Sequence, residues 1–155
     1  MAHRLFDPVH AFLVELATAA LFSYSVWHWG TTPAGGAWCL YSAAILVLAL
    51  IDWDTTLLPD DITLPLLWAG LIVAALRWTE VGLQQSLWGA VAGYLSLWLV
   101  YHAFRLATGK EGMGYGDFKL FAALGAWLGW QMLPLIVLLS SAVGAVIGIG
   151  LILFR

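Results

Sequence analysis

Two aspartates, Asp52 and Asp117, stand at the ends of long apolar runs in this sequence. Two carboxylates that lie side by side in a low-dielectric site cannot both ionise easily, so one of them keeps its proton. The ionised aspartate can then activate a water molecule while the protonated one polarises a peptide carbonyl, and the two exchange these roles as the amine leaves. The residue types therefore suit acid proteolysis, with protons that belong to the pair rather than to either residue.

A glycine-rich stretch precedes the second aspartate, and it contains Gly114 and Gly116. Glycine lets a backbone come close to another chain or to a ligand because it has no Cβ atom. We therefore expect these two glycines to let the backbone of a substrate approach Asp117.

The composition places the aspartates in a membrane protein. Of the 155 residues, 63% are hydrophobic and only 10% are charged, which is far from the balance of a soluble domain. Ten tryptophans fit aromatic belts at the two lipid–water interfaces. The formal net charge of −3 is small, and we expect no nucleic-acid partner. The single cysteine excludes an internal disulfide, and no His, Cys and carboxylate cluster has metal-ligand spacing, so we expect no metal.

Hydrophobic runs separated by polar or Gly/Pro breaks predict an all-α, polytopic membrane helix bundle in one domain, residues 1–155. The first run carries Glu15 and is too long for the apolar core of a signal peptide, so we interpret it as a retained transmembrane helix. The six expected transmembrane helices cover about residues 11–29, 36–51, 63–77, 84–104, 118–130 and 132–154.

The distribution of basic residues gives the bundle an orientation. If the N-terminus is cytoplasmic, Arg77 alone lies near the outer side, in agreement with the positive-inside rule. Both termini are then cytoplasmic, and two crossings return the chain from Asp52 to the same side at Asp117. At ~1.5 Å per residue, the spans beside these residues cover only ~22 and ~20 Å of a ~30 Å hydrocarbon core. Both aspartates should therefore be recessed below the cytoplasmic surface. The basic residues on the inner side are Arg4, Arg105, Lys110, Lys119 and Arg155.

Other polar residues near these helix ends have structural interpretations. Asp60, Asp61 or Thr63 can cap the helix that begins there, with Pro65 in its first turn. Lys119 points to a different helix face from the aspartate two residues before it. We interpret this lysine mainly as an anchor at the membrane interface, and a supporting role at the site is also open.

Glu15 lies about one turn inside the first expected helix, where an unpaired carboxylate is costly. Its partner could be the Thr18 hydroxyl or Lys119, or the carboxyl could be protonated and bonded to a neighbouring helix. A supporting role near the aspartate pair is a further alternative.

Small residues in the last two expected helices predict close helix packing rather than chemistry, because they let two backbones approach. They are Gly125, Gly129, Gly144, Gly148 and Gly150.

Two motifs of this chain resemble the signatures of the type IV prepilin peptidases, which are bacterial inner-membrane aspartic proteases of the GxGD type. They are Gly114-Tyr-Gly-Asp117, followed by Lys119, and the upstream Ile51-Asp-Trp-Asp-Thr-Thr-Leu-Leu-Pro-Asp60. The resemblance runs from about Phe12 through the last expected helix. It implies an aspartic endopeptidase in which Asp52 and Asp117 are the catalytic residues.

The resemblance also implies a substrate, namely a type IV prepilin or a type II secretion pseudopilin. Such a substrate is cleaved at the cytoplasmic face after a glycine that follows a short basic leader. An acidic rim could bind that leader while the apolar helix of the substrate lies in the bilayer. The rim consists of Asp54, Asp60, Asp61 and Glu111.

Many members of this family also N-methylate the new N-terminal residue with S-adenosylmethionine, and they carry paired CxxC motifs ahead of the matched region. This chain begins after that point and ends at Arg155, before a further segment that members tend to have. We expect either a shortened piece or a cleavage-only member. Proteolysis would need no cofactor, and S-adenosylmethionine would be needed only if methylation is retained. The oligomeric state is open.

Two other classes of function fit the same residues. The chain could be a non-enzymatic membrane assembly subunit that keeps the fold, or a small proton-coupled carrier that uses Glu15, Asp52 and Asp117 as a relay. A carrier is expected to show internal repeats with broken helices in matching halves, and the sequence shows none. Aspartates that can be replaced without loss would favour the assembly subunit.

Overall fold

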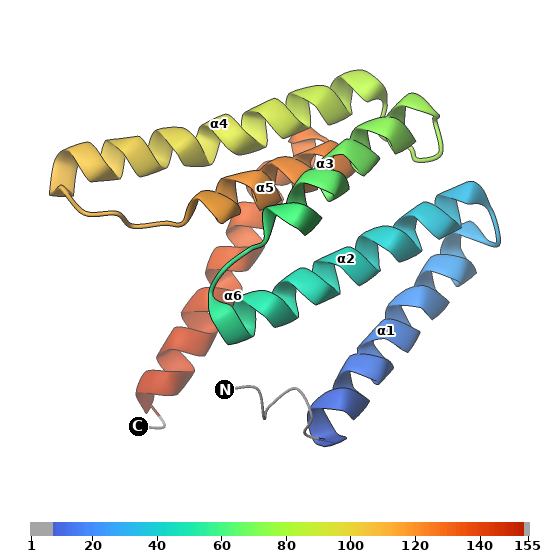
Figure 1. Cartoon of the computed structure of the whole chain (residues 1–155), viewed down its shortest axis with the longest axis horizontal. Coiled ribbons are helices and arrows are strands. Elements are labelled where there is room, and N and C mark those ends of the chain that lie inside the picture. The colour runs from blue at the N-terminus through green and yellow to red at the C-terminus, as the bar shows by residue number, and fades with distance from the viewer. Residues whose placement is uncertain (1–7, 154–155) are drawn as a thin grey trace.

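A computed structural model describes residues 8–153, which form six α-helices and one short 3₁₀-helix (Figure 1). In chain order they are α1 (Pro8–Trp29), α2 (Pro33–Thr55), α3 (Asp60–Ala75), α4 (Leu83–Thr108), α5 (Tyr115–Leu128), the 3₁₀-helix η1 (Trp130–Met132) and α6 (Leu133–Leu153). Arg4 and Arg155, which the predicted orientation uses, and residue 154, where the last predicted helix ends, lie outside the described residues.

Four helical segments are long and apolar enough to cross a membrane: α1, α2, α4, and η1 together with α6. Helix α3 has 16 residues and α5 has 14, so both are shorter than these four. The all-α, polytopic membrane bundle that the sequence predicts is therefore confirmed.

Helix α2 is held at both ends by threonines. Thr32 Oγ1 accepts a hydrogen bond from the Gly35 N–H at 3.3 Å, and Pro33 supplies the first helical residue, where no backbone donor is needed. The helix continues past residue 51 to Thr55, and Thr56 ends it in the left-handed conformation with φ 54°. The Thr56 N–H donates to the Asp52 carbonyl at 2.8 Å. The first candidate aspartate therefore lies inside the last turn of α2.

Helix α3 begins earlier than the sequence predicts. Its N-cap is Pro59, whose carbonyl accepts the Thr63 N–H at 3.1 Å, and no side chain makes a capping hydrogen bond. The capping role predicted for Asp60, Asp61 or Thr63 is therefore wrong. Asp60 and Asp61 lie in the first turn, where a carboxylate interacts favourably with the helix dipole. Because the helix starts at Asp60, Pro65 lies inside it, beyond the first turn.

Helix α5 packs most extensively against α4 and α3. The backbones of α4 and α5 touch, because a Cβ atom on Gly125 would lie only 2.0 Å from the Gly89 carbonyl oxygen. Close by, the buried Ser86 hydroxyl donates to the Ala126 carbonyl at 2.6 Å. The predicted close packing is thus confirmed for Gly125, whereas Gly129 ends α5 with a positive φ of 82°.

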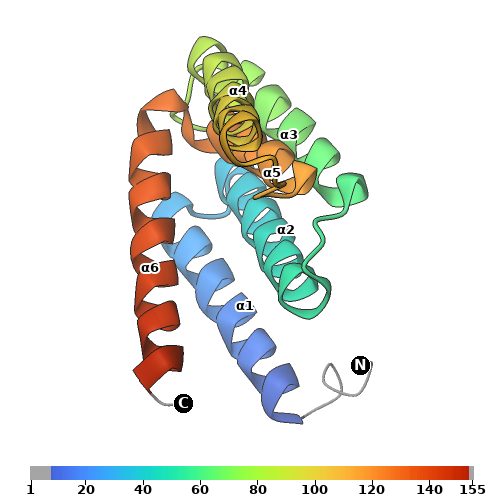
Figure 2. The ribbon, with the colours of Figure 1, turned by 90° about the vertical axis from the view of Figure 1, so that its left-hand side faces the viewer.

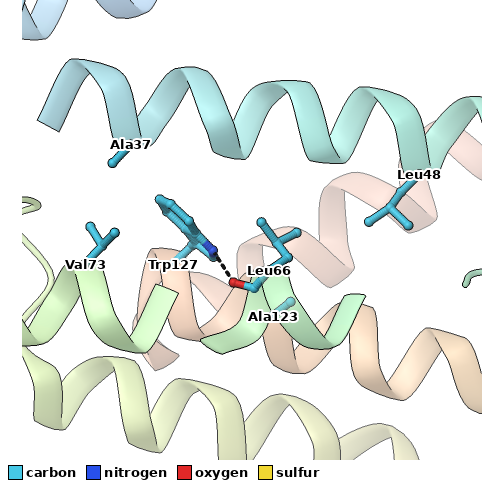
Figure 3. Packing of buried hydrophobic residues seen from close by; sticks show 6 residues of the cluster. All are labelled: Ala37, Leu48, Leu66, Val73, Ala123 and Trp127. Carbon is cyan, nitrogen blue, oxygen red and sulfur yellow. Dashed lines mark hydrogen bonds between the residues drawn. The ribbon is translucent and has the colours of Figure 1, made fainter. Parts of the chain in front are cut away.

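Trp127 links α5 to α3 and α2 in the hydrophobic core (Figure 3). Its indole Nε1 donates to the Leu66 carbonyl of α3 at 2.8 Å, and the side chain is only 1% exposed. Ala37 and Leu48 of α2 face the same cluster, which also contains Val73 and Ala123. The indole fixes which face of α5 turns toward α2 and α3.

Helices α1 and α6 are peripheral. Helix α1 packs on α2, and the rings of Trp29 and Trp38 stack there with centroids 5.2 Å apart. Helix α6 extends away from the packed helices (Figure 2), and no neighbouring atom lies within 4 Å of a Cβ built on Gly144, Gly148 or Gly150. The close packing predicted for those three glycines is therefore wrong within the described part of the chain.

Candidate active site

A cavity of about 750 Å³ opens where α2 ends and α5 begins. Its walls come from the last turn of α2, the α2–α3 connection, the first turn of α3, the α4–α5 loop and the first turns of α5. The lining residues are Asp52, Thr56, Leu57, Leu58, Asp60, Gly112, Met113, Gly114, Tyr115, Gly116, Asp117 and Lys119. The two candidate aspartates, which come from different helices, thus line the same cavity.

Asp117 is the third residue of α5, after the N-cap Gly114. The carboxyl group is half-buried, outside the four segments that are long enough to cross a membrane. Burial raises the pKa of this carboxyl, the negative charge of Asp52 raises it further, and a hydrogen bond from the Gly114 backbone acts in the opposite direction. The contribution from Asp52 means that the two carboxylates interact electrostatically across the cavity.

Asp52 is exposed in the last turn of α2, one helical turn before the left-handed Thr56. A β-branched residue rarely has a positive φ, so the backbone that ends α2 beside this aspartate is strained. The bond from the Thr56 N–H to the Asp52 carbonyl holds the strained residue against the helix end. The chain turns away from α2 immediately after the carboxylate.

The glycines before Asp117 have different surroundings. A Cβ atom on Gly116 would lie 2.9 Å from the Leu58 Cβ, so this glycine allows the α2–α3 connection to pack against α5. At Gly114 the nearest atom to such a Cβ is an Asp117 carboxylate oxygen, 4.0 Å away. Of the two motif glycines, Gly114 is the one that leaves space beside the carboxylate for another backbone.

Lys119 does not point freely to the membrane interface. Its Nζ donates to Asp60 Oδ2 at 2.5 Å, which joins the first turns of α5 and α3. The interpretation of Lys119 mainly as an interface anchor is therefore wrong, because the helix face it occupies turns toward α3. Both members of this ion pair line the cavity.

The remaining predicted site residues are more distant or less engaged. Asp54, Asp61 and Glu111 are exposed near the cavity in the chain but do not line it, so Asp60 alone of the predicted rim is a wall residue. Glu15 is exposed on α1, which contributes no residue to the cavity.

Two of the partners predicted for Glu15 are engaged elsewhere. The Thr18 hydroxyl donates to the Val14 carbonyl at 2.7 Å, and Lys119 pairs with Asp60. The structure therefore does not bring Glu15 to the aspartate pair.

Sequence reasoning missed several wall residues, chiefly Thr56, Leu57, Leu58 and Tyr115. Leu57 and Leu58 follow the strained end of α2. The apolar run Leu57-Leu58-Pro59, which comes shortly after Asp52 and Asp54 in the sequence, could have indicated an apolar wall of the site. Tyr115 sits inside the glycine motif, and its ring packs against Phe118 with centroids 5.5 Å apart. These residues give the cavity an apolar side that can contact a peptide.

The arrangement suits hydrolysis of a peptide bond. A coupled carboxylate pair can hold one proton between its members, and the ionised member can take a proton from water. Among the described residues no group of three or more His, Cys, Asp and Glu side chains could hold a metal ion.

The fold and site define a polytopic helical membrane protein with a paired-aspartate cavity at one end of the bundle. Residues 39–149 match the model of the type IV leader peptidase family. The chain belongs to that family, and it is a bacterial membrane protein.

Curated relatives are similar over most of this chain. A prepilin leader peptidase/N-methyltransferase from Stutzerimonas stutzeri is 57% identical over 136 residues, which are 88% of this chain and 47% of the relative. Proteins of the same name from Pseudomonas aeruginosa and Aeromonas hydrophila are 56% and 57% identical, each over 92% of this chain and 49% of the relative. The chain spans about half the length of the curated relatives it matches. No solved structure is similar enough to match.

Proposed function

We propose that this chain is an aspartic endopeptidase that removes the leader of a type IV prepilin or a type II secretion pseudopilin. The observation that carries the proposal is that Asp52 and Asp117 line one cavity, where burial and the Asp52 charge raise the pKa of Asp117. The names of the similar proteins support the same activity, because each is a prepilin leader peptidase.

The reaction begins with one proton on the Asp52–Asp117 pair. The ionised carboxylate takes a proton from a water molecule, whose oxygen attacks the carbonyl carbon of the scissile peptide. The protonated carboxyl donates its proton to the carbonyl oxygen, so the tetrahedral intermediate carries no full negative charge. The intermediate collapses when the nitrogen takes the proton that the pair had accepted from water, and a hydroxyl of the tetrahedral diol gives its proton to the other carboxylate. The amine then leaves, and the pair again holds one proton.

The cavity walls support a peptide substrate. Gly114 leaves space beside the Asp117 carboxylate for a second backbone, and Leu57 and Leu58 supply an apolar wall. A short basic leader would be attracted to negative charge at this end of the bundle, since Asp54 and Glu111 are exposed there. The apolar helix of the substrate would remain in the bilayer beside the spans.

We place the cavity at the cytoplasmic face of the bacterial inner membrane. The cavity end of the molecule includes the basic residues Arg105 and Lys110 at the end of α4 and in the α4–α5 loop, whereas Arg77 follows α3 at the opposite end. This asymmetry agrees with the positive-inside rule. Both termini are cytoplasmic in this orientation.

The proposal includes no cofactor. S-adenosylmethionine would supply a methyl group to the new N-terminal amine, which is a step that peptide hydrolysis does not require. A second cavity beside the aspartate cavity, lined by Val100, Tyr101, Phe104, Gly112 and Met113, has a volume of about 170 Å³. That is smaller than the ~300–1,000 Å³ of typical ligand pockets, so it does not fit a nucleoside cofactor. No step therefore runs through S-adenosylmethionine.

The test is cleavage of a purified prepilin by the purified chain in lipid vesicles, read by the mass of the products. Wild-type protein should release the leader, and the mass of the mature product would show whether its new amino terminus is unmodified. Asp52→Asn and Asp117→Asn should each reduce cleavage by roughly 10²- to 10⁴-fold, the usual contribution of a positioned acid–base group.

Asp61→Asn is the matched control, since it removes one carboxylate at the same end of the bundle from a residue that does not line the cavity. It should cleave at close to the wild-type rate. Folding of every variant is checked by thermal unfolding in detergent. No cleavage by well-folded wild type would contradict the proposal and favour a non-enzymatic assembly subunit.

A further inference from the structure

The ion pair between Lys119 and Asp60 lies at the aspartate cavity, and the reaction described above does not use it. Lys119 belongs to the first turns of α5, two residues after Asp117, and Asp60 is the first residue of α3. Their side chains bond at 2.5 Å, and both line the cavity. This contact joins residues that are 59 positions apart in the chain. It brings a cation to the edge of a site in which two carboxylates share one proton.

A free ammonium group at this position would oppose the chemistry of the pair. A positive charge within about 4–6 Å of a carboxylate favours its ionised form, whereas the reaction needs one carboxyl to keep its proton. In the structure the Lys119 ammonium is directed to Asp60. The pKa of the Asp117 carboxyl is raised by its burial and by the Asp52 charge, and the Gly114 backbone acts in the opposite direction.

We propose that Asp60 is a positioning residue that holds the Lys119 ammonium away from the Asp52–Asp117 pair, so that the pair keeps its shared proton at the pH of catalysis. The inference rests on the proposed peptidase function. Asp60 itself acts on neither substrate nor water. Its effect is electrostatic, and it acts through Lys119.

Other charged or titratable groups belong to the elements that surround the cavity, and they are unchanged in the single and double variants of Asp60 and Lys119. They are Asp52 and Asp54 from α2, Asp61 from α3, Tyr101 and Arg105 from α4, Glu111 from the α4–α5 loop, and Tyr115 from α5. Their charges are the same in the wild type and in these variants, so a shift of the pH profile is due to the change in the Lys119–Asp60 ion pair.

The test is the pH dependence of prepilin cleavage by the full chain in lipid vesicles. Activity should fall at high pH, when the pair loses its shared proton. Asp60→Asn leaves the ammonium without its partner, which favours ionised carboxylates, so the high-pH limb should move to lower pH. Lys119→Gln leaves Asp60 as an unpaired negative charge, so the limb should move to higher pH. Because Lys119 and Asp60 are 28% and 51% exposed, each shift should be on the order of half a pH unit.

The double variant separates this role from a structural one. With Asp60→Asn and Lys119→Gln combined, both charges are absent and the limb should return close to its wild-type position. If the ion pair only held α3 against α5, the double variant would keep the defect of the single variants, which would overturn the proposal. Asp60→Glu keeps the pair and should keep the wild-type profile.

Asp61→Asn is the matched control, since it removes the same charge from the next residue of α3 without releasing a cation. A shift in this variant equal to that of Asp60→Asn would also overturn the proposal. Absence of cleavage in the wild type would refute the peptidase function itself, whereas wild-type cleavage with an unmoved limb in Asp60→Asn refutes only the role of Asp60.

Discussion

The two halves of α5 have opposite surroundings, although they belong to one helix of 14 residues. Most residues of its second half are buried: Gly125 touches the backbone of α4, and Trp127 bonds to α3. Its first turns line an open cavity with Asp117 half-buried and Lys119 in an ion pair. The packed half fixes the helix, and the open half presents chemical groups at a defined position.

This division separates stability from activity along a single helix. Changes in the second half should reduce the free energy of unfolding, because they alter a close-packed interface. Changes in the first turns should reduce cleavage while the fold persists.

Gly125→Leu should have the largest effect on stability. A Cβ atom at this position would overlap the Gly89 carbonyl, and both are backbone atoms that cannot move without separating α4 from α5. We expect a loss of about 3 kcal/mol or more in unfolding free energy, or no folded protein. Thermal unfolding in detergent measures it. Gly148→Leu on α6 is the control, because nothing lies within 4 Å of its Cβ position, and an equal loss there would contradict the comparison.

Trp127→Phe should cost about 1–3 kcal/mol. The substitution removes the indole N–H that bonds to the Leu66 carbonyl and leaves a gap in the core. Thermal or denaturant unfolding reports the loss, while cleavage measured well below the unfolding temperature should change little. Trp68→Phe provides the reference, since that indole is 62% exposed, and it should be close to neutral.

Thr56→Gly should stabilise the protein by up to about 1 kcal/mol. A left-handed backbone costs an L residue about 1–2 kcal/mol, and glycine avoids that cost but loses more conformational entropy on folding. Thr55→Gly, at the last residue of α2, should instead destabilise, because it removes the hydroxyl that donates to the Ile51 carbonyl and has no strained backbone to relieve. If Thr56→Gly lowered the unfolding temperature as Thr55→Gly does, the strain assigned to the end of α2 would be wrong.

Asp117→Asn should increase stability slightly at neutral pH. The pKa of Asp117 is raised in the folded protein, so the folded state binds the proton more tightly than the unfolded state does. Its contribution to stability is therefore present below the ordinary aspartate pKa of about 3.9 and is lost as the pH rises through the raised value. Because asparagine does not ionise, Asp117→Asn removes this loss of stability near neutral pH. Unfolding temperatures of wild type and variant should converge in acid and separate near neutral pH.

The fold was largely predictable because the apolar runs and their breaks carry the signal. The runs predict six helices, and two crossings between Asp52 and Asp117 return the chain to the same end. The apolar pattern does not predict the length of α2, because the helix ends at the left-handed Thr56 and no glycine marks this end in the sequence. It also could not give the start of α3, where Pro59 acts as N-cap without a side-chain hydrogen bond.

Contacts between distant segments explain the remaining errors at the site. The spacing predicts that Lys119 lies on a different helix face from Asp117, but which helix meets that face depends on how Trp127 and Gly125 orient α5. The glycines of the last two helices look alike in the sequence. Within the described residues, Gly125 of α5 packs against the backbone of α4, whereas Gly144, Gly148 and Gly150 of α6 have no atom within 4 Å of their Cβ positions. Local patterns predict that a residue is available for contact, and tertiary packing decides what it contacts.

The joint action of the two carboxylates is measured by the cleavage rates of Asp52→Asn, Asp117→Asn and the double variant on one prepilin, under conditions where all three are folded. If the two carboxylates act as one pair, each single variant loses activity by roughly 10²- to 10⁴-fold, and the double variant is no slower than the singles. A single variant that stays within about tenfold of wild type, or losses that multiply in the double variant, would contradict the account.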